Sequence, residues 1–246
     1  MTNKYMYFIA NWKMYGDRKS LNSLDKVIKF SKSDKINKGR LIYCPPYTLI
    51  SSFFKRFRNC QIDIGAQNCH ESENYGPFTG YVNSRMLKNA GANYVIIGHS
   101  ENRANGESDK LINLKIKSAL KAKLKVIFCI GETISEKRKK KTLSILSKQI
   151  KIGLNKIKSS SHIFIAYEPV WAIGTGIIPK SKDLLQTIDF IKSKFKDKSP
   201  KVLYGGSVNP HNIDNLKEIN NIDGFLIGGA SQNAKKFIDI VKKTYS

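Results

Sequence analysis

Eight short apolar runs, separated by longer amphipathic segments, constrain the fold of this 246-residue chain more than any other feature of its sequence. The runs are apolar nearly throughout, which is typical of parallel strands buried on both faces. Between them, apolar residues recur at helical spacing, as in residues 111–120 and 184–191. The predicted strands are residues 5–10, 41–44, 62–66, 94–97, 126–130, 163–167, 202–204 and 225–227.

Regular alternation of strands and helices predicts βαβ units and therefore an α/β fold. Eight strands in a chain of this length favour a closed (β/α)8 barrel, with eight parallel strands inside and helices outside. No linker, low-complexity tract or change of composition divides the sequence, so we expect residues 1–246 to form a single barrel domain. A doubly wound open sheet is the alternative. It would usually carry a glycine fingerprint after its first strand, where this chain has Asn11-Trp12-Lys13-Met14.

The chain carries 43 basic and 19 acidic residues, which gives a net charge of +24. Such a charge is compatible with nucleic acid, an anionic membrane or a phosphorylated small molecule as a partner. The basic residues are spread over nearly every predicted helix, and the densest run, residues 137–141, has no interleaved aromatic residue. No apolar run approaches membrane-spanning length. We therefore expect neither nucleic acid nor a membrane as a partner.

The N-terminus and the cysteines predict a cytoplasmic protein. Residues 1–14 have a short apolar centre, but Asn11 and Lys13 lie where a cleavage region would be, so this segment is a poor secretory signal. The cysteines form no C-x-x-C pair and lie in or beside predicted strands, which favours reduced thiols over disulfides or a zinc site. They are Cys44, Cys60, Cys69 and Cys129.

The sixth predicted strand is followed by a lone glutamate, Glu168. In (β/α)8 barrels, active-site residues collect at the C-terminal ends of the strands. A mostly apolar stretch, residues 169–176, comes next and ends in Gly174-Thr175-Gly176. A carboxylate beside a loop with glycine hinges suggests a base under a movable lid, and we call residues 169–176 the lid. The alternative is an ordinary strand-to-helix connection, which would have to expose Trp171 and Ile173 to water.

A lysine and an imidazole follow two other predicted strands. Asn11 and Lys13 come after the first, where a lysine can stabilise a developing oxyanion or a phosphate, and His99 comes after the fourth. A helix N-terminus beyond His99 would favour the neutral imidazole. Taken one at a time, a surface lysine and a core histidine are the alternative interpretations of Lys13 and His99.

Two glycine pairs follow the last two strands, in Tyr204-Gly205-Gly206-Ser207 and Ile227-Gly228-Gly229-Ala230-Ser231. Backbone N–H groups with no side chain in the way can cradle a phosphate, and barrels bind phosphate after strands seven and eight. A carboxylate, an imidazole, a lysine, a phosphate cradle and a lid together predict one kind of site. It would remove a proton from a carbon next to a carbonyl in a small phosphorylated substrate.

Several segments, taken together, resemble the motifs of the triosephosphate isomerase family. They occur in the family's order and cover the chain from end to end. The segments are Asn11-Trp12-Lys13-Met14, Ile97-Gly98-His99-Ser100-Glu101, Ala166-Tyr167-Glu168-Pro169-Val170-Trp171-Ala172-Ile173-Gly174-Thr175-Gly176, Tyr204-Gly205-Gly206-Ser207 and Gly228-Gly229-Ala230-Ser231, with Gly65-Ala66-Gln67-Asn68 and Cys129-Ile130-Gly131-Glu132 in addition.

The resemblance implies an enzyme of glycolysis and gluconeogenesis that interconverts dihydroxyacetone phosphate and D-glyceraldehyde 3-phosphate through an enediolate, with no metal or other cofactor. In that family a glutamate base, a neutral histidine and a closing loop are well established. By the resemblance, Glu168 would move the proton, His99 would polarise the carbonyl and Lys13 would balance the developing charge. The resemblance also implies supporting roles: Glu101 would hold Lys13, Ile173 and Leu226 would exclude water from Glu168, and Tyr204 would latch the lid. The residues that would contact the substrate or its phosphate are Asn11, Gly174, Ser207, Gly228 and Gly229.

The resemblance further implies a homodimer, in which a loop of one subunit enters a pocket near the active site of the other. Here that loop would be residues 68–80, with Thr79 reaching the partner. Where the family pairs a glutamate with an arginine across the interface, this chain has Tyr81 and Asn102. Because both charges are lost together, no buried charge is left unpaired. We therefore expect neutral contacts of Tyr81 and Asn102 to replace the ion pair.

Three alternatives to this function stay open. A catalytically inactive barrel acting as a binding or scaffold protein would normally have lost Glu168, His99 or Lys13, and all three are present. A basic barrel associated with nucleic acid is supported only by the net charge. Another aldose–ketose isomerase is the third alternative, and the short phosphate cradle favours a three-carbon substrate by resemblance.

Overall fold

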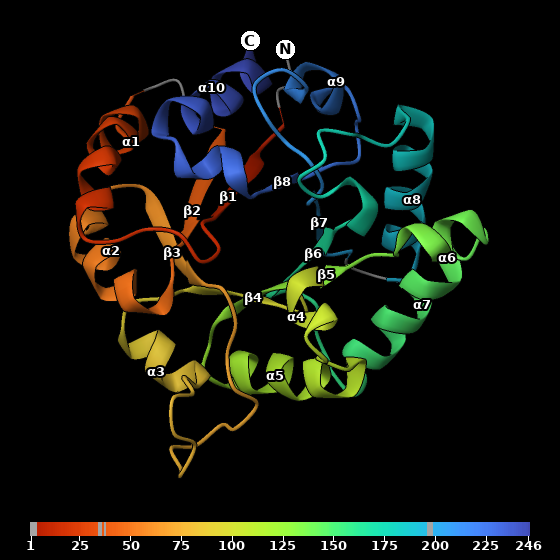
Figure 1. The fold of residues 1–246 in the computed structure, drawn as a ribbon, viewed down its shortest axis with the longest axis horizontal. Helices are drawn as coiled ribbons and strands as arrows, with labels where there is room; N and C mark the ends of the chain where they lie inside the picture. Colours follow the sequence, from red (N-terminus) through yellow and green to blue (C-terminus); the bar gives the residue numbers. More distant parts are fainter. Residues whose placement is uncertain (1–3, 34–35, 37, 196–198) are drawn as a thin grey trace.

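The computed structural model describes residues 4–33, 36, 38–195 and 199–246. In this part of the chain, eight parallel strands close into a barrel in sequence order, as Figure 1 shows. The expected (β/α)8 barrel is therefore confirmed. The strands are β1 (Met6–Asn11), β2 (Gly39–Cys44), β3 (Ile62–Ala66), β4 (Tyr94–Ile97), β5 (Lys125–Ile130), β6 (Ile163–Tyr167), β7 (Lys201–Tyr204) and β8 (Gly224–Ile227). The ring closes where β1 pairs with β8, from Tyr7 opposite Gly224 to Ala10 opposite Ile227.

Helices surround the ring of strands (Figure 1). The predicted helical stretches 111–120 and 184–191 lie inside α5 (Asp109–Lys121) and α8 (Ser181–Ser193). The other helices are α1 (Leu24–Ser31), α2 (Ile50–Phe57), α3 (Ser84–Asn89), α4 (Ser100–Ala104), α6 (Ile134–Arg138), α7 (Thr142–Gly153), α9 (Ile213–Lys217) and α10 (Ala234–Tyr245), with 3-10 turns η1 (Lys19–Ser23), η3 (Tyr47–Leu49), η4 (Val170–Ala172) and η5 (Gly229–Gln232). Within the described residues, none of these helices has the length and apolar character needed to cross a membrane.

Two clusters of apolar side chains explain why the predicted strands are apolar on both faces. One cluster contains Ile9, whereas the neighbouring residues Phe8 and Ala10 belong to the other, so side chains alternate along β1. The first cluster is contributed by strand residues and fills the barrel interior, while the second joins strands to helices. The interior cluster consists of Ile9, Ile42, Cys44, Tyr94, Ile96, Ile127, Cys129, Phe164, Ala166, Leu203 and Leu226. All four cysteines are free thiols.

The N-terminal edges of some strands differ from the sequence prediction. β1 begins at Met6, one residue later than expected, and Tyr5 is 45% exposed. β7 and β8 begin earlier than expected, at Lys201 and Gly224, although neither residue is apolar. The difference arises because a strand begins and ends where its backbone pairs with a neighbour, whether or not the side chain at that position is buried.

An ionic cluster lies at this N-terminal edge of the barrel. The Asp223 carboxylate accepts a hydrogen bond from the Val202 N–H at 2.9 Å. Its oxygens lie 2.9 Å from Lys192 Nζ and 3.2 Å from Lys4 Nζ. Contacts at this face of a barrel serve stability, whereas sites form at the opposite face.

Candidate active site

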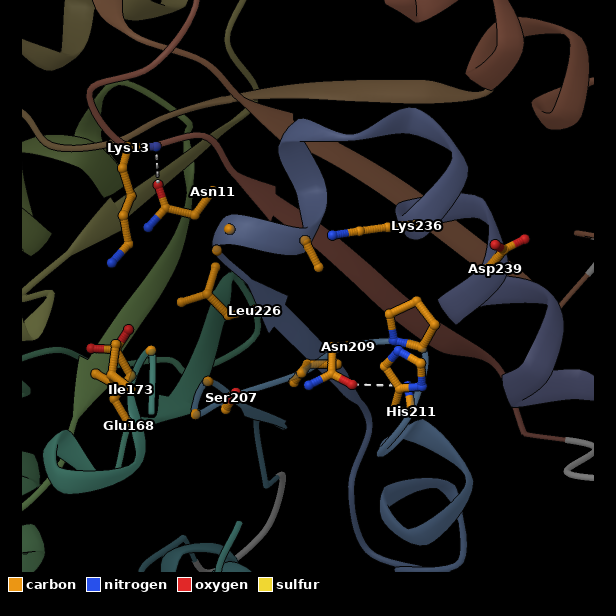
Figure 2. Close-up of a pocket in the computed structure, with 18 of the residues that line it drawn as sticks. Asn11, Lys13, Glu168, Ile173, Ser207, Asn209, His211, Leu226, Lys236 and Asp239 are labelled. Carbon is orange, nitrogen blue, oxygen red and sulfur yellow. Dashed lines mark hydrogen bonds between the residues drawn. The ribbon is translucent and has the colours of Figure 1, made fainter. Parts of the chain in front are cut away.

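A cavity of about 480 Å³ is lined by residues that follow β1, β4, β6, β7 and β8 (Figure 2). Distant parts of the sequence therefore meet at the C-terminal ends of the strands. Figure 2 shows Lys13 and Glu168 toward one end of the cavity and His211 and Asp239 toward the other. Of the predicted site residues, those that line it are Asn11, Lys13, His99, Glu168, Ile173, Gly174, Ser207, Leu226, Gly228 and Gly229.

Glu168 follows β6 directly and is only 2% exposed. Its Oε1 lies 3.1 Å from His99 Nε2, and its Oε2 accepts a hydrogen bond from the Ser100 N–H at 3.0 Å. Both carboxylate oxygens are thus bonded to the first residues after β4. A Cβ at Gly205 would lie 2.8 Å from Glu168 Cγ, so a glycine is required beside this side chain.

His99 ends the connection from β4 and caps α4. Its Nδ1 accepts a hydrogen bond from the Glu101 N–H at 3.2 Å. An accepting Nδ1 carries no proton, so the ring N–H is on Nε2, which faces Glu168. This arrangement is that of a neutral imidazole with a donor directed at the carboxylate.

Lys13 is held in a left-handed backbone conformation, with φ of +53°. Its N–H donates to Asn11 Oδ1 at 3.1 Å, and its carbonyl accepts from Gln67 Nε2 at 2.8 Å. Its ammonium lies 2.6 Å from Glu101 Oε1. A residue in this uncommon conformation persists where the surroundings over-determine it. Gln67 is a positioning residue that sequence reasoning missed, although it lies in a segment that carries the family resemblance.

The residues predicted to cradle a phosphate lie in the turn after β7 and in and just before η5. The Trp12 indole donates to the Ser231 carbonyl at 3.1 Å, and Ser231 Oγ donates to the Gly228 carbonyl at 2.7 Å, which fixes the turn. A Cβ at Gly229 would meet nothing within 4 Å. The backbone of this turn is therefore open to the cavity, as an anion-binding turn requires.

The cavity also extends beyond the predicted residues. Lys236 and Lys235, at the start of α10, line its outer part with Asn209, His211 and Asp239. The sequence alone does not mark these residues because they lie in a helix and a loop with no distinctive pattern. Lys235 and Lys236 add positive charge to this part of the cavity, and Asp239 adds negative charge.

The first part of the lid contains η4. Its tryptophan, Trp171, bonds to Glu132, which does not line the cavity. Trp171 Nε1 donates to Glu132 Oε1 at 3.0 Å, and the Tyr167 hydroxyl lies 3.2 Å from both oxygens of the same carboxylate. Burial raises the pKa of the Glu132 carboxyl, and the hydrogen bonds from Trp171 and Tyr167 oppose that effect. Glu132 is a second residue that sequence reasoning missed, although it lies in a segment that carries the resemblance.

The tip of the lid makes few contacts. Gly174 and Gly176 have φ of +72° and +78°, and a Cβ at either would meet nothing within 4 Å. Tyr204, the residue expected to latch the lid, has a buried hydroxyl with no hydrogen-bond partner in the described part of the chain. The lid tip is therefore unlatched in this conformation.

Cys129 lies in the barrel interior below this site. Burial, followed by the charge of the nearby Glu168 carboxylate, raises the pKa of the Cys129 thiol well above its usual range. The thiol is therefore protonated and unreactive, in keeping with a small core residue.

The residues expected at a dimer interface lie outside the cavity. Thr79 and Tyr81 belong to the loop before α3, which projects from the barrel in Figure 1. The Tyr81 ring packs against His70, with ring centroids 4.9 Å apart, and yet Tyr81 remains 65% exposed. Asn102 lies in α4 and is half-buried. The structure thus leaves Tyr81 available for contact with another molecule.

Comparisons with known proteins agree with this geometry. A family model described as triosephosphate isomerase matches residues 6–244. The triosephosphate isomerase of Thermodesulfovibrio yellowstonii is 43% identical over 244 residues, covering 96% of this chain and 98% of that protein. That of Syntrophotalea carbinolica is 40% identical over 246 residues, covering 96% and 97%. The crystal structure of triosephosphate isomerase from Bartonella henselae has a TM-score of 0.88 and 36% identity, covering 98% of this chain and 100% of that one. The chain belongs to the triosephosphate isomerase family.

Proposed function

We propose that this chain interconverts dihydroxyacetone phosphate and D-glyceraldehyde 3-phosphate through an enediolate intermediate. The observation that carries the proposal is the contact between Glu168 Oε1 and His99 Nε2, 3.1 Å apart in a cavity that also holds Lys13 and two glycine turns. A base, a neutral hydrogen-bond donor, a cation and a phosphate cradle are the groups that this reaction requires.

The reaction follows from these groups. Glu168 takes a proton from the carbon next to the carbonyl, and the C–H electron pair forms the double bond of the enediolate. The Nε2–H of His99 donates to the carbonyl oxygen as negative charge develops there, and the ammonium of Lys13 stabilises that charge. Glu168 then returns the proton to the neighbouring carbon, while His99 passes a proton between the two oxygens.

Substrate binding has to free the base first. In the described conformation, the oxygens of Glu168 are bonded to His99 and to the Ser100 N–H. A substrate carbonyl that takes the His99 hydrogen bond releases Oε1 toward the substrate carbon. Asn11 would contact the substrate, and Gly174, Ser207, Gly228 and Gly229 would bind its phosphate once the lid closes. Ile173 and Leu226, which line the cavity, would then exclude water from the carboxylate.

The proposed chemistry needs no metal or organic cofactor. The substrate's own carbonyl acidifies the neighbouring C–H bond, and a side-chain base and donor supply the proton transfers. Closure of the lid protects the enediolate, because an enediolate that is open to water can lose its phosphate.

A coupled assay of the purified protein tests this function. Wild type should turn over both triose phosphates. Glu168→Asp, which withdraws the carboxylate by about 1 Å, should lower kcat about 100-fold. Lys13→Ala should lower kcat/KM at least as much, because it removes a cation that acts on developing charge. Lys151→Ala, an exposed charge on α7, is the control. Absence of turnover in wild type would favour the inactive scaffold, and unchanged turnover in both site variants would overturn the assigned roles.

We also propose that the chain acts as a homodimer, with Thr79 reaching the partner's site and Tyr81 and Asn102 making neutral contacts. Exposed apolar side chains support this proposal, since Met14 is 94% exposed and Tyr15 and Tyr75 are more than half exposed. Sedimentation velocity at micromolar concentration should give a dimer, and Tyr81→Glu should shift it toward monomer. A wild-type monomer at that concentration would contradict the proposal. The cytoplasmic location stays a prediction.

A further inference from the structure

Asn212 is the N-cap residue of α9, but its side chain does not cap that helix. Asparagine is preferred at an N-cap because its side-chain oxygen usually accepts an N–H of the first helical turn. Here the amide bonds back to the loop between β7 and α9. Its Nδ2 donates to the Ser207 carbonyl at 3.0 Å, and its Oδ1 accepts the Asn209 N–H at 2.9 Å. Both functions of the amide are therefore used by the loop that carries Ser207.

Asn209 bonds to the same loop in return. Its Oδ1 accepts the backbone N–H of His211 at 2.8 Å, drawn as a dashed line in Figure 2, and that of Asn212 at 3.2 Å. Its carbonyl accepts the Ile213 N–H at 3.2 Å, where α9 starts. Asparagine side chains stabilise turns in this way because they bond to backbone groups that lack a partner in a helix or sheet. Two asparagines thus close the segment 207–212.

The turn between β7 and this segment is fixed at both ends. At its start, the Gly205 N–H donates to the Tyr167 carbonyl at 2.8 Å. At its end, Asn212 Nδ2 donates to the Ser207 carbonyl, which has no other donor in the part of the chain that the structure describes. The N–H groups of residues 206–208 donate to no other group of the described chain, and all three residues line the cavity. These donors are therefore open to a ligand.

Unbonded N–H groups around a turn suit an anion if the turn keeps its shape. Gly205 and Gly206 give the backbone more freedom than other residues would, so the bond at Ser207 has to supply the order. Donors that are already in place bind a ligand more tightly, because binding does not have to order them. Among the described residues, Asn212 is not part of the cavity lining, so it acts on the cavity through Ser207.

We propose that Asn212 is a positioning residue, which fixes the turn after β7 so that the backbone N–H groups of this turn bind the phosphate of the substrate. The inference rests on the proposed function, because that function supplies the phosphorylated substrate. Loss of the Asn212 amide leaves the N–H groups present but lets their directions vary. Binding of the phosphate then weakens, while the groups that move the proton are unchanged.

Calorimetry with a stable enediolate mimic, a phosphorylated two-carbon carboxylic acid, measures the effect on binding. Asn212→Ala should bind the mimic about three- to tenfold more weakly than wild type, the range expected for the loss of one hydrogen bond. Asn215→Ala makes the same change at an exposed position of α9 and should bind like wild type. Equal affinities of Asn212→Ala and wild type would overturn the inference.

Asn212→Asp separates the two functions of the amide. Its carboxylate still accepts the Asn209 N–H, but it cannot donate to the Ser207 carbonyl. This variant should therefore lose at least as much affinity as Asn212→Ala. Asn215→Asp places the same charge on α9 and corrects for repulsion between that charge and the anionic mimic. If Asn212→Ala does not fold, the two aspartate variants decide, and equal affinities in both contradict the role of Asn212.

A comparison of substrates distinguishes positioning of the phosphate from general stability. In Asn212→Ala, kcat/KM for glyceraldehyde 3-phosphate should fall by about the factor measured for the mimic. Exchange of deuterium into unphosphorylated glyceraldehyde, followed by NMR, should keep its wild-type rate, because Glu168, His99 and Lys13 are unchanged. A residue that only stabilises the fold would lower both rates by the same factor, through loss of folded protein. Equal losses would therefore reject the positioning role.

Binding of inorganic phosphate separates this inference from the proposed function, because it needs no turnover. Asn212→Ala should bind phosphate more weakly than wild type, whereas Asn215→Ala should not. If wild type binds phosphate but turns over no triose phosphate, the proposed function fails, and the difference between the two variants still decides on Asn212. If wild type binds no phosphate, the turn is not a phosphate site and the inference fails.

Discussion

The hydroxyl of Tyr204 is expected to contribute to activity without stabilising the ligand-free fold. It is buried at the end of β7 and has no hydrogen-bond partner in the described residues. A Cβ at Gly206 would lie 2.2 Å from it, so even the neighbouring residue must be a glycine. Leaving a buried hydroxyl without a partner costs about 1–3 kcal/mol. We expect the closed lid to supply a hydrogen-bond partner for this hydroxyl, which would offset the cost.

Tyr204→Phe should therefore leave the free energy of unfolding of the ligand-free protein unchanged or slightly higher. It should lower kcat about tenfold, since the closed lid would lose one hydrogen bond. Urea unfolding and the coupled assay measure the two effects. Tyr43→Phe is a matched control, because the Tyr43 hydroxyl is also buried without a partner but lies in the core between β2 and α2. Similar losses of kcat in the two variants would argue against a latch.

At this scale, sequence reasoning found the residues at the strand ends and missed those that hold them. Glu168 and His99 stand out because a charged or imidazole side chain within two residues of the end of a buried strand is unusual. Gln67 and Glu132 lie in loops, and their partners are far along the sequence, at Lys13 and Trp171. Spacing gives no distance between two loops, so only the folded barrel brings these pairs together.

At the scale of elements, the barrel is stabilised at the face opposite the site. Asp223 joins the start of β8 to β7 through the Val202 N–H and to α8 through Lys192. Burial acts to raise the pKa of the Asp223 carboxyl, but the hydrogen bonds from Lys192 and Val202 outweigh it and lower that pKa below its usual range. The native state thus binds the ionised form more strongly than the unfolded chain does.

Asp223→Ala should lower the free energy of unfolding at pH 7 by about 3 kcal/mol, because it leaves a cluster of lysines without their common partner. A lowered pKa gives stability that is present above the unfolded value, near 3.8, and lost as pH falls through the folded value. The difference from wild type should therefore shrink as the pH is lowered from 4 to 2. Urea unfolding across this range measures it, and kcat at pH 7 should be unchanged. Asp214→Ala, an exposed acid with lysine partners, should have a much smaller effect.

The elements themselves were largely predictable because each strand is buried on both faces and each long helix on one. The ends of the strands were not predictable. β7 and β8 start earlier than predicted, because backbone pairing extends beyond the apolar run at its N-terminal end. The five-residue helices α4 and α6 have too few turns for a helical period to be visible. Ser100, the first residue of α4, nevertheless bonds to Glu168, and Glu132, in the loop before α6, bonds to Trp171. The least predictable elements therefore adjoin the site.

At the scale of the whole molecule, the net charge of +24 opposes folding. Like charges on a compact surface repel one another, and the unfolded chain relieves that repulsion. Sodium chloride at 0.5 M should therefore raise the urea midpoint above its value at 0.02 M, as screening weakens the repulsion. Chloride is the appropriate salt, because sulfate also stabilises by exclusion from the surface. A midpoint that falls with added chloride would mean that attractive ion pairs outweigh the excess positive charge.

The positive charge that opposes folding should favour capture of the anionic substrate. Added salt should therefore stabilise the fold and weaken capture. Lys13, Lys235 and Lys236 line the cavity together with two acids, Glu168 and Asp239, so the lining has an excess of positive charge. A cavity with an excess of one sign of charge concentrates ligands of the other sign. Raising sodium chloride from 0.02 to 0.5 M should thus lower kcat/KM for the phosphorylated triose about tenfold, while the folded protein becomes more stable. Unphosphorylated glyceraldehyde is the control substrate, because it has no charge to steer. If both substrates lose the same factor, salt acts on the lid or on the catalytic groups. If neither does, the lysines of the cavity wall make no contribution to capture, and the basic composition is confined to solvated helix faces.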